Sequence, residues 1–159
     1  MHKILLEKPE FYAEFHIAQA NYARWKEGVT QREIDEFVLR ADEIYQNAHE
    51  APGFVWRYDG KMCSPTIDEL FGFNRVLLNM SVWESIDELK HFVVHGAHLD
   101  AMKSDPIWVE EDLNVSSVLW WVATGTTPSI SEAKNKLDSL KSHGATQAAF
   151  TFNRRFQPL

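Results

Sequence analysis

Three times in this chain a Ser or Thr is followed three residues later by a Glu, just before a segment with helical periodicity. The pairs are Thr30 and Glu33, Ser85 and Glu88, and Ser129 and Glu132. In such a capping box the hydroxyl and the carboxylate each accept a hydrogen bond from a backbone amide that has no partner within the helix. The chain is therefore predicted to contain three helices that begin at these positions.

Apolar residues follow the first and third capping boxes at helical spacing. The first stripe consists of Ile34, Phe37, Val38, Ala41, Ile44, Tyr45 and Ala48. This helix should end near Ala51, because Pro52 and Gly53 stop it. The third helix carries Ala133, Leu137 and Leu140 and should end at His143 and Gly144.

The segments around these helices are typical of strands. We expect strands at residues 16–24, 54–58, 75–83 and 115–122, with a short fifth strand at 148–152. The order β-α-β-β-α-β is the ferredoxin-like pattern, an α+β fold with an antiparallel sheet. The third helix and the fifth strand are appended to it at the C-terminal end. At 159 residues, positions 1–159 are expected to form one domain.

The third and fourth predicted strands are apolar on both faces. In the third strand Leu78 and Met80 lie on one side, and Leu77 and Trp83 lie on the other. A ferredoxin-like sheet carries helices on one face only, so its second face needs a separate cover. A homodimer that pairs two sheets face to face would supply it, with Leu119 or Trp121 in the interface.

Residues 59–74 connect the second and third strands and contain Gly60, Pro65 and Gly72. This connection is longer than a hairpin needs. We interpret it either as an elaborated loop or as a lid.

Composition narrows the class of partner. The net charge of −7 argues against binding to a phosphate backbone, so no nucleic-acid partner is expected. The single cysteine, Cys63, excludes an intramolecular disulfide and fits a reducing compartment. The longest apolar run, at 118–123, is far too short to span a bilayer. We therefore expect a cytoplasmic protein with no membrane partner.

Polar side chains interrupt one face of the third strand. Asn79, Ser81 and Trp83 share that face, because side chains alternate along a strand. An amide, a hydroxyl and an indole at the end of a buried strand suggest the floor of a pocket. The alternative is that Trp83 is a core residue and that Asn79 binds nearby backbone groups.

The helix after this strand carries His91, His95 and His98 within one narrow stripe. Two of them could bind a metal ion, although we expect no metal site. The stripe faces either the pocket or solvent, and Gly96 could separate His98 from the other two.

Three further residues could line a pocket. Gln19 and Asn21 form a polar pair on one face of an otherwise apolar strand. Arg57 could hold an anionic substrate or form an ion pair at an interface.

Five stretches of the chain resemble the domain-of-unknown-function family 3291. They are Ala-Gln-Ala-Asn-Tyr-Ala-Arg at 18–24, Pro-Gly-Phe-Val-Trp-Arg at 52–57, Asn-Met-Ser-Val-Trp-Glu-Ser at 79–85, Leu-Trp-Trp-Val at 119–122 and Ala-Phe-Thr-Phe at 149–152. That family looks like a branch of the dimeric α+β barrel superfamily, the fold of antibiotic-biosynthesis monooxygenases. The resemblance implies a dimeric barrel and leaves the activity unassigned.

In the cofactor-free monooxygenases of that superfamily, an Asn and a Trp at similar spacing line the substrate cavity. The resemblance thus implies that Asn79 donates to an oxyanion while dioxygen oxidises a phenolate. Trp83 would be a second donor or stack on an aromatic ligand. His98 would orient or deprotonate that ligand.

Haem-binding members carry an Asn on the first strand, which Asn21 matches, and a helix His, which this chain lacks near Val93. Three functions therefore remain open. The chain could be a cofactor-independent monooxygenase acting on a small aromatic or polyketide-like compound. It could instead be a non-catalytic ligand-binding dimer, or a haem-binding protein.

Overall fold

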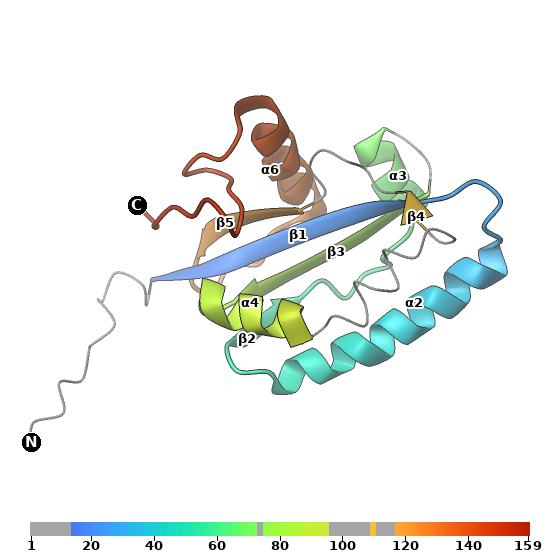
Figure 1. Cartoon of the computed structure of the whole chain (residues 1–159), viewed down its shortest axis with the longest axis horizontal. Helices are drawn as coiled ribbons and strands as arrows, with labels where there is room; N and C mark the ends of the chain where they lie inside the picture. Colours follow the sequence, from blue (N-terminus) through green and yellow to red (C-terminus); the bar gives the residue numbers. More distant parts are fainter. Residues whose placement is uncertain (1–13, 73–74, 96–108, 111–116) are drawn as a thin grey trace, which may run out of the picture.

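A computed structural model describes residues 14–72, 75–95, 109–110 and 117–159 (Figure 1). It has an α+β architecture in which helices lie on both sides of one open antiparallel sheet. Helices α3 and α6 lie above the sheet in Figure 1, and α2 and α4 lie below it.

The sheet has the ferredoxin-like strand order. Its members are β1 (Phe15–Trp25), β2 (Phe54–Arg57), β3 (Val76–Trp83), β4 (Val109–Glu110) and β5 (Ser117–Ala123). They are arranged as β2-β3-β1, and β4 and β5 both pair with the other edge of β1. The four main strands agree with the expected segments to within two residues.

Helices begin at all three predicted positions, and the reciprocal capping box is formed at Thr30 and Glu33. Helix α2 (Gln31–Gln46) starts after Thr30 and continues into a short 3₁₀ turn, η1 (Asn47–Glu50). Helix α4 (Ile86–His95) follows Ser85, and α6 (Ile130–His143) follows Ser129. No helix in the described ranges is long and apolar enough to cross a membrane.

The long connection at 59–74 contains a helix that we did not predict. Helix α3 (Pro65–Phe71) is capped by the Ser64 hydroxyl, which accepts a hydrogen bond from the Ile67 amide. It begins with a proline and ends at Gly72, whose positive φ of 78° favours glycine. Ile67 and Phe71 of this helix are buried in the core, which favours the elaborated loop over the lid for residues 65–71.

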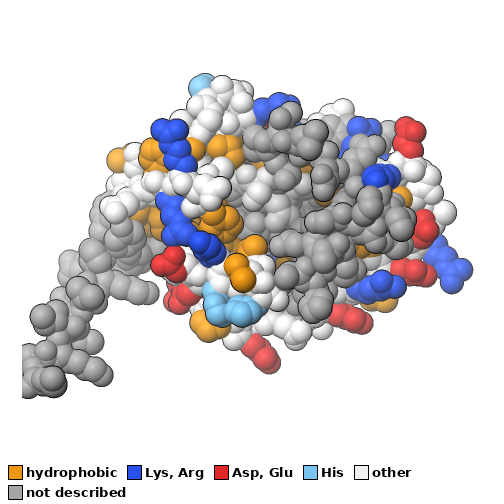
Figure 2. All heavy atoms as spheres, in the orientation of Figure 1, with side chains coloured by type: hydrophobic (Ala, Val, Ile, Leu, Met, Phe, Trp, Pro, Cys, Tyr) orange, Lys and Arg blue, Asp and Glu red, His pale blue; other side chains and the backbone are white. Residues whose placement is uncertain are grey.

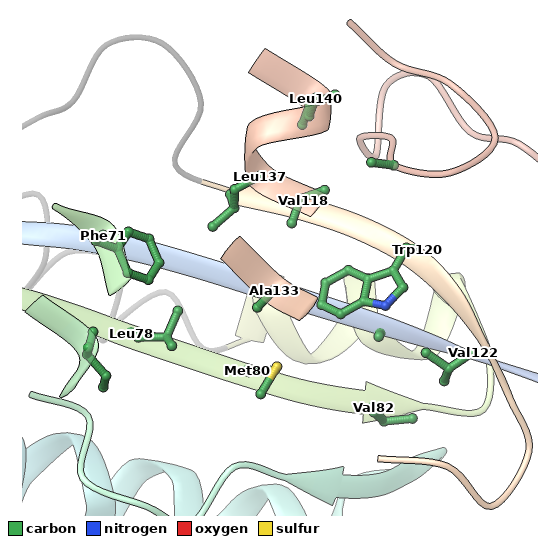
Figure 3. Close-up of a cluster of buried hydrophobic side chains, with 14 of the residues drawn as sticks. Phe71, Leu78, Met80, Val82, Val118, Trp120, Val122, Ala133, Leu137 and Leu140 are labelled. Atoms are coloured by element: carbon green, nitrogen blue, oxygen red, sulfur yellow. The ribbon is translucent and has the colours of Figure 1, made fainter. Parts of the chain in front are cut away.

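Helices α3 and α6 bury one face of the sheet, which we call the α3/α6 face. Met80 of β3 and Trp120 of β5 lie there, packed beneath Leu137 of α6 (Figure 3). Trp120 also donates a hydrogen bond to the Glu132 carboxylate at 3.2 Å. The premise that helices cover only one face is wrong, because the chain's own appended helix and α3 cover the second.

Helices α2 and α4 cover the opposite face, which we call the α2/α4 face. At one end Trp25 and Leu77 pack with Phe37 of α2. At the other end Ile17 and Trp83 pack with residues of α4. Two separate apolar clusters therefore occupy this face.

The expected fifth strand is reduced to isolated bridges, of which one, between Phe150 and Leu119, joins it to β5. Phe150 exchanges two backbone hydrogen bonds with Leu119, of 2.8 and 2.9 Å, along the outer edge of β5. Trp121, once expected either in the core or in a dimer interface, donates to the Phe156 carbonyl at 2.7 Å. The C-terminal segment thus covers the part of β5 that the sequence suggested for a partner.

Candidate functional site

Four polar side chains occupy the middle of the α2/α4 face, between its two apolar clusters. Gln19 lies opposite Ser81 and Asn21 lies opposite Asn79 in the antiparallel pairing of β1 with β3. We call these four residues the polar block. The alternation of side chains that buries Ala18, Ala20, Leu78 and Met80 against α3 and α6 puts the polar block on the opposite face.

Three hydrogen bonds connect most of the polar block. The Asn21 amide donates to Gln19 Oε1 at 3.3 Å, and Gln19 Nε2 donates to Ser81 Oγ at 2.9 Å. The Trp83 indole N–H also donates to Ser81 Oγ at 2.9 Å. Ser81 is therefore the point at which the two strands are linked by side chains.

Asn79 differs from its three neighbours. Its side chain is only 6% exposed, yet within the described part of the chain its amide makes no side-chain hydrogen bond. Among the described residues the one fully enclosed polar side-chain atom without a partner is His16 Nδ1, so the Asn79 amide keeps some access to solvent. The amide is thus free to bind a group from outside the chain.

The resemblance implied that Trp83 donates a hydrogen bond to a ligand or stacks on it, and its surroundings suit neither role. None of its surface is exposed, and its indole N–H is already bound to Ser81. Its ring packs against Phe92 at 4.8 Å and edge-on against Phe54 at 5.5 Å, measured between ring centroids. Trp83 therefore uses its one donor to hold the Ser81 hydroxyl, and its buried ring has no exposed surface on which a ligand could stack.

Arg57 lies opposite Ser81 in the pairing of β2 with β3. Its guanidinium donates to the Asp42 carboxylate at 2.8 Å and lies 4.5 Å from the centre of the Tyr45 ring. Arg57 was expected either to hold an anionic substrate or to form an ion pair at an interface. The geometry favours an ion pair, but the pair with Asp42 forms within one chain. Arg57 also lines an open cleft of about 530 Å³ together with Gln46 and His49.

The histidine stripe is only partly described, because His98 lies outside the described residues and its expected role stays a prediction. His91 and His95 are both exposed, with their ring centroids 4.1 Å apart. Figure 2 shows histidine side chains at the surface beside α4. The described residues contain no cluster of three metal-ligating side chains.

Haem does not fit the described residues. The α4 position where a ligand would be expected is Val93, which packs in the apolar cluster around Trp83. The described histidines of that helix are exposed instead. Asn21, the other match to haem-binding proteins, is engaged with Gln19.

Cys63 accepts a hydrogen bond from the Trp25 indole at 3.4 Å. Burial raises the pKa of its thiol above the ordinary value of 9.0, and Asp68 and Asp35 add to that rise while Trp25 opposes it. A nucleophilic cysteine needs a lowered pKa. Cys63 is therefore unsuited to that role.

The chain was next compared with known proteins. The family model described as Domain of unknown function (DUF3291) matches residues 16–159. The chain belongs to this family. No curated protein matches it.

A solved structure, the hydroxynitrile lyase from Passiflora edulis, is similar over 72% of this chain and 98% of its own. Its sequence identity is 19% and the TM-score is 0.41, too low to support an inference about function.

Sequence reasoning identified Gln19, Asn21 and Asn79 and did not single out Ser81 for a role. The alternation of side chains places Ser81 on the right face, but only the strand register shows that it joins both strands. Phe92, which contacts both apolar clusters, was also missed. In the described part of this family member, Gln19, Asn21 and Ser81 are joined by hydrogen bonds, and the neighbouring Asn79 amide makes no side-chain hydrogen bond. Apolar side chains flank all four residues.

Proposed function

We propose that this chain binds a small aromatic or polyketide-like molecule over the polar block and holds one oxygen atom of it at Asn79. The Asn79 amide, which makes no side-chain hydrogen bond within the described part of the chain, carries the proposal. An oxygen atom of a ligand would accept a hydrogen bond from this amide without displacing a side chain of the described residues.

The surroundings of the polar block support an aromatic ligand. Of the aromatic rings at the two ends of the block, Trp83, Trp25 and Phe37 are buried, and Phe92 is partly exposed and packs against both apolar clusters. Ligand sites are commonly apolar with a few polar groups that fix orientation. The α2/α4 face has this composition.

A binding assay with a panel of anthrones and hydroquinones tests the proposal. We expect Asn79→Ala to weaken binding by roughly tenfold, the usual effect of losing one hydrogen bond in a buried site. Asn135→Ala on the exposed side of α6 is the matched control and should bind as the wild type does. Equal affinity in all three proteins would disprove the assignment of Asn79.

A second candidate is cofactor-free oxidation of the same class of ligand. A donor in apolar surroundings stabilises a phenolate, and so would favour its reaction with dioxygen. For an anthrone the ring CH₂ becomes a carbonyl; one oxygen atom of O₂ enters the product and the other leaves as water. No external reductant is needed.

Oxygen uptake distinguishes catalysis from binding alone. If the chain is an oxygenase, an anthrone that binds should consume one O₂ per quinone formed. Asn79→Ala should lower the turnover roughly a hundredfold, as expected for the loss of one oxyanion donor. Binding without oxygen uptake would leave the non-catalytic function as the correct one.

A further inference from the structure

The hydroxyl of Ser81 has no remaining capacity to accept hydrogen bonds. A serine hydroxyl has two lone pairs and one proton. Gln19 Nε2 and Trp83 Nε1 both donate to Ser81 Oγ, each at 2.9 Å. Among the described residues no group accepts the Ser81 proton, so the hydroxyl is left as a donor only.

The hydrogen bonds that lead to Ser81 all run in one direction. Asn21 donates to Gln19, and Gln19 donates to Ser81. In such a chain each bond polarises the next, which strengthens the last donor. The Ser81 proton is the last donor in this series of hydrogen bonds.

The Asn79 amide, without a side-chain hydrogen bond in the part of the chain that the structure describes, lies two residues away on the same face of β3, roughly 7 Å along the strand. Ser81 is 7% exposed and Asn79 is 6% exposed. Both groups are therefore nearly removed from water. An amide can donate or accept, so Asn79 by itself does not select the polarity of a ligand, whereas Ser81 does.

We propose that Ser81 and Asn79 form a pair of donors that selects ligands bearing an acceptor oxygen, namely a phenolate, an enolate or a carbonyl. Gln19 and Trp83 are positioning residues, because they occupy the lone pairs of Ser81 and so fix its proton as a donor. This inference rests on the proposed function and specifies the ligand class of the same site.

The discrimination between two probes of the same shape tests this selection. 4-Nitrophenolate presents an acceptor oxygen, whereas 4-nitroaniline presents an N–H donor at the same position. We expect the wild type to bind the phenolate at least tenfold more tightly, because a buried donor without a partner penalises the amine. The pKa of bound 4-nitrophenol should also fall, because hydrogen bonds to the anion stabilise it.

Three variants separate a donor role of Ser81 from a structural one. Ser81→Ala should lose the preference for the phenolate and the pKa shift of the bound probe, and Ser81→Thr should restore both. Gln19→Met keeps the Ser81 hydroxyl but frees one of its lone pairs, so it should reduce the preference while binding persists. Ser131→Ala, an exposed serine of α6, should behave as the wild type does.

The outcomes separate the two proposals. If Asn79→Ala weakens binding but Ser81→Ala keeps the phenolate preference, the donor pair is wrong and the proposed function stands. An equal or greater affinity of the wild type for 4-nitroaniline would overturn the donor pair in the same way. If neither probe binds in a manner that depends on Asn79, the proposed function itself fails. Circular dichroism of each variant establishes that it is folded.

Discussion

At the scale of single residues, the most informative feature is the Asn79 amide, which makes no side-chain hydrogen bond within the described part of the chain. It lies directly opposite Asn21, which donates to Gln19. The Asn79 amide can therefore bind a group from outside the chain without losing a side-chain hydrogen bond to the described residues.

Replacing the amide by an apolar side chain of similar size should therefore cost little stability. We expect Asn79→Leu to change the free energy of unfolding by less than about 1 kcal/mol, because it breaks no side-chain hydrogen bond within the described part of the chain. Binding of the anthrone panel should be lost in the same variant. Urea denaturation measures the first effect. A loss of more than about 1 kcal/mol would mean that the amide contributes to stability in the free protein.

Cys63 gives a second prediction at this scale. Burial raises the pKa of its thiol, so the unfolded chain loses the thiol proton at a lower pH than the folded chain does. The stability that this thiol contributes is fully present below its ordinary value of 9.0 and is lost as the pH rises above it.

The difference in unfolding free energy between the wild type and Cys63→Ala should thus shrink as the pH rises above 9.0. A disulfide reagent should label Cys63 slowly in the native protein at pH 8 and quickly after denaturation. Rapid labelling of the native protein would show that the thiol is accessible and its pKa is not raised.

At the scale of elements, the C-terminal segment acts as a cover for β5. Phe150 is completely buried between Trp121 and Phe156, with ring centroids 6.4 and 6.0 Å away. Arg155 extends the contact to α4 through Asp87, at 3.0 Å. This segment has almost no regular secondary structure, so its side chains must supply its stability.

Phe150→Ala should accordingly destabilise the protein by about 3–5 kcal/mol, the usual loss for a buried aromatic side chain. Phe152, which is half-buried, is the matched control, and Phe152→Ala should cost less. Arg155→Ala should cost under about 1 kcal/mol, as exposed ion pairs do. Thermal or urea unfolding measures all three. Similar losses for Phe150→Ala and Phe152→Ala would contradict the inference that burial of Phe150 holds the C-terminal segment on β5.

The elements also show which parts of the fold a sequence reveals. The capping boxes and the apolar stripe of α2 depend on local chemistry, so three helices and the ferredoxin-like order were predictable. Helix α3 has similar local signals in Ser64, Pro65 and Gly72, but its seven residues are too few to display a periodic stripe. The polar block was visible in part, because alternation identifies a face but not the partner across the strand.

At the scale of the whole molecule, both faces of the sheet are covered within one chain. Val118, Met80 and Leu78 are completely buried beneath α3 and α6, and Leu119, one of the two residues expected in a dimer interface, is buried on the α2/α4 face. The homodimer stays a prediction, with a mass of about twice 18.4 kDa in light scattering. Because the chain covers both faces of its own sheet, an uncovered face is no longer an argument for pairing two sheets face to face.

A charge on the α3/α6 face tests whether this face is the core of the single chain or an interface between two chains. We expect Val118→Glu to unfold the chain, because it buries an unpaired charge in the chain's own core at a cost of several kcal/mol. Circular dichroism and light scattering together measure the outcome. A folded monomer with wild-type helix content would instead indicate that the α3/α6 face is a dimer interface.

The bridge between Phe150 and Leu119 also has a consequence for synthesis of the chain on the ribosome. Strand β5 is complete at Ala123, but the residue that covers its edge follows more than twenty positions later. At about 5–20 residues per second, the nascent chain carries an open strand edge for roughly one to five seconds. During that time Leu119 and Trp121 can pair with a neighbouring nascent chain, and chaperones that bind open edges would protect them.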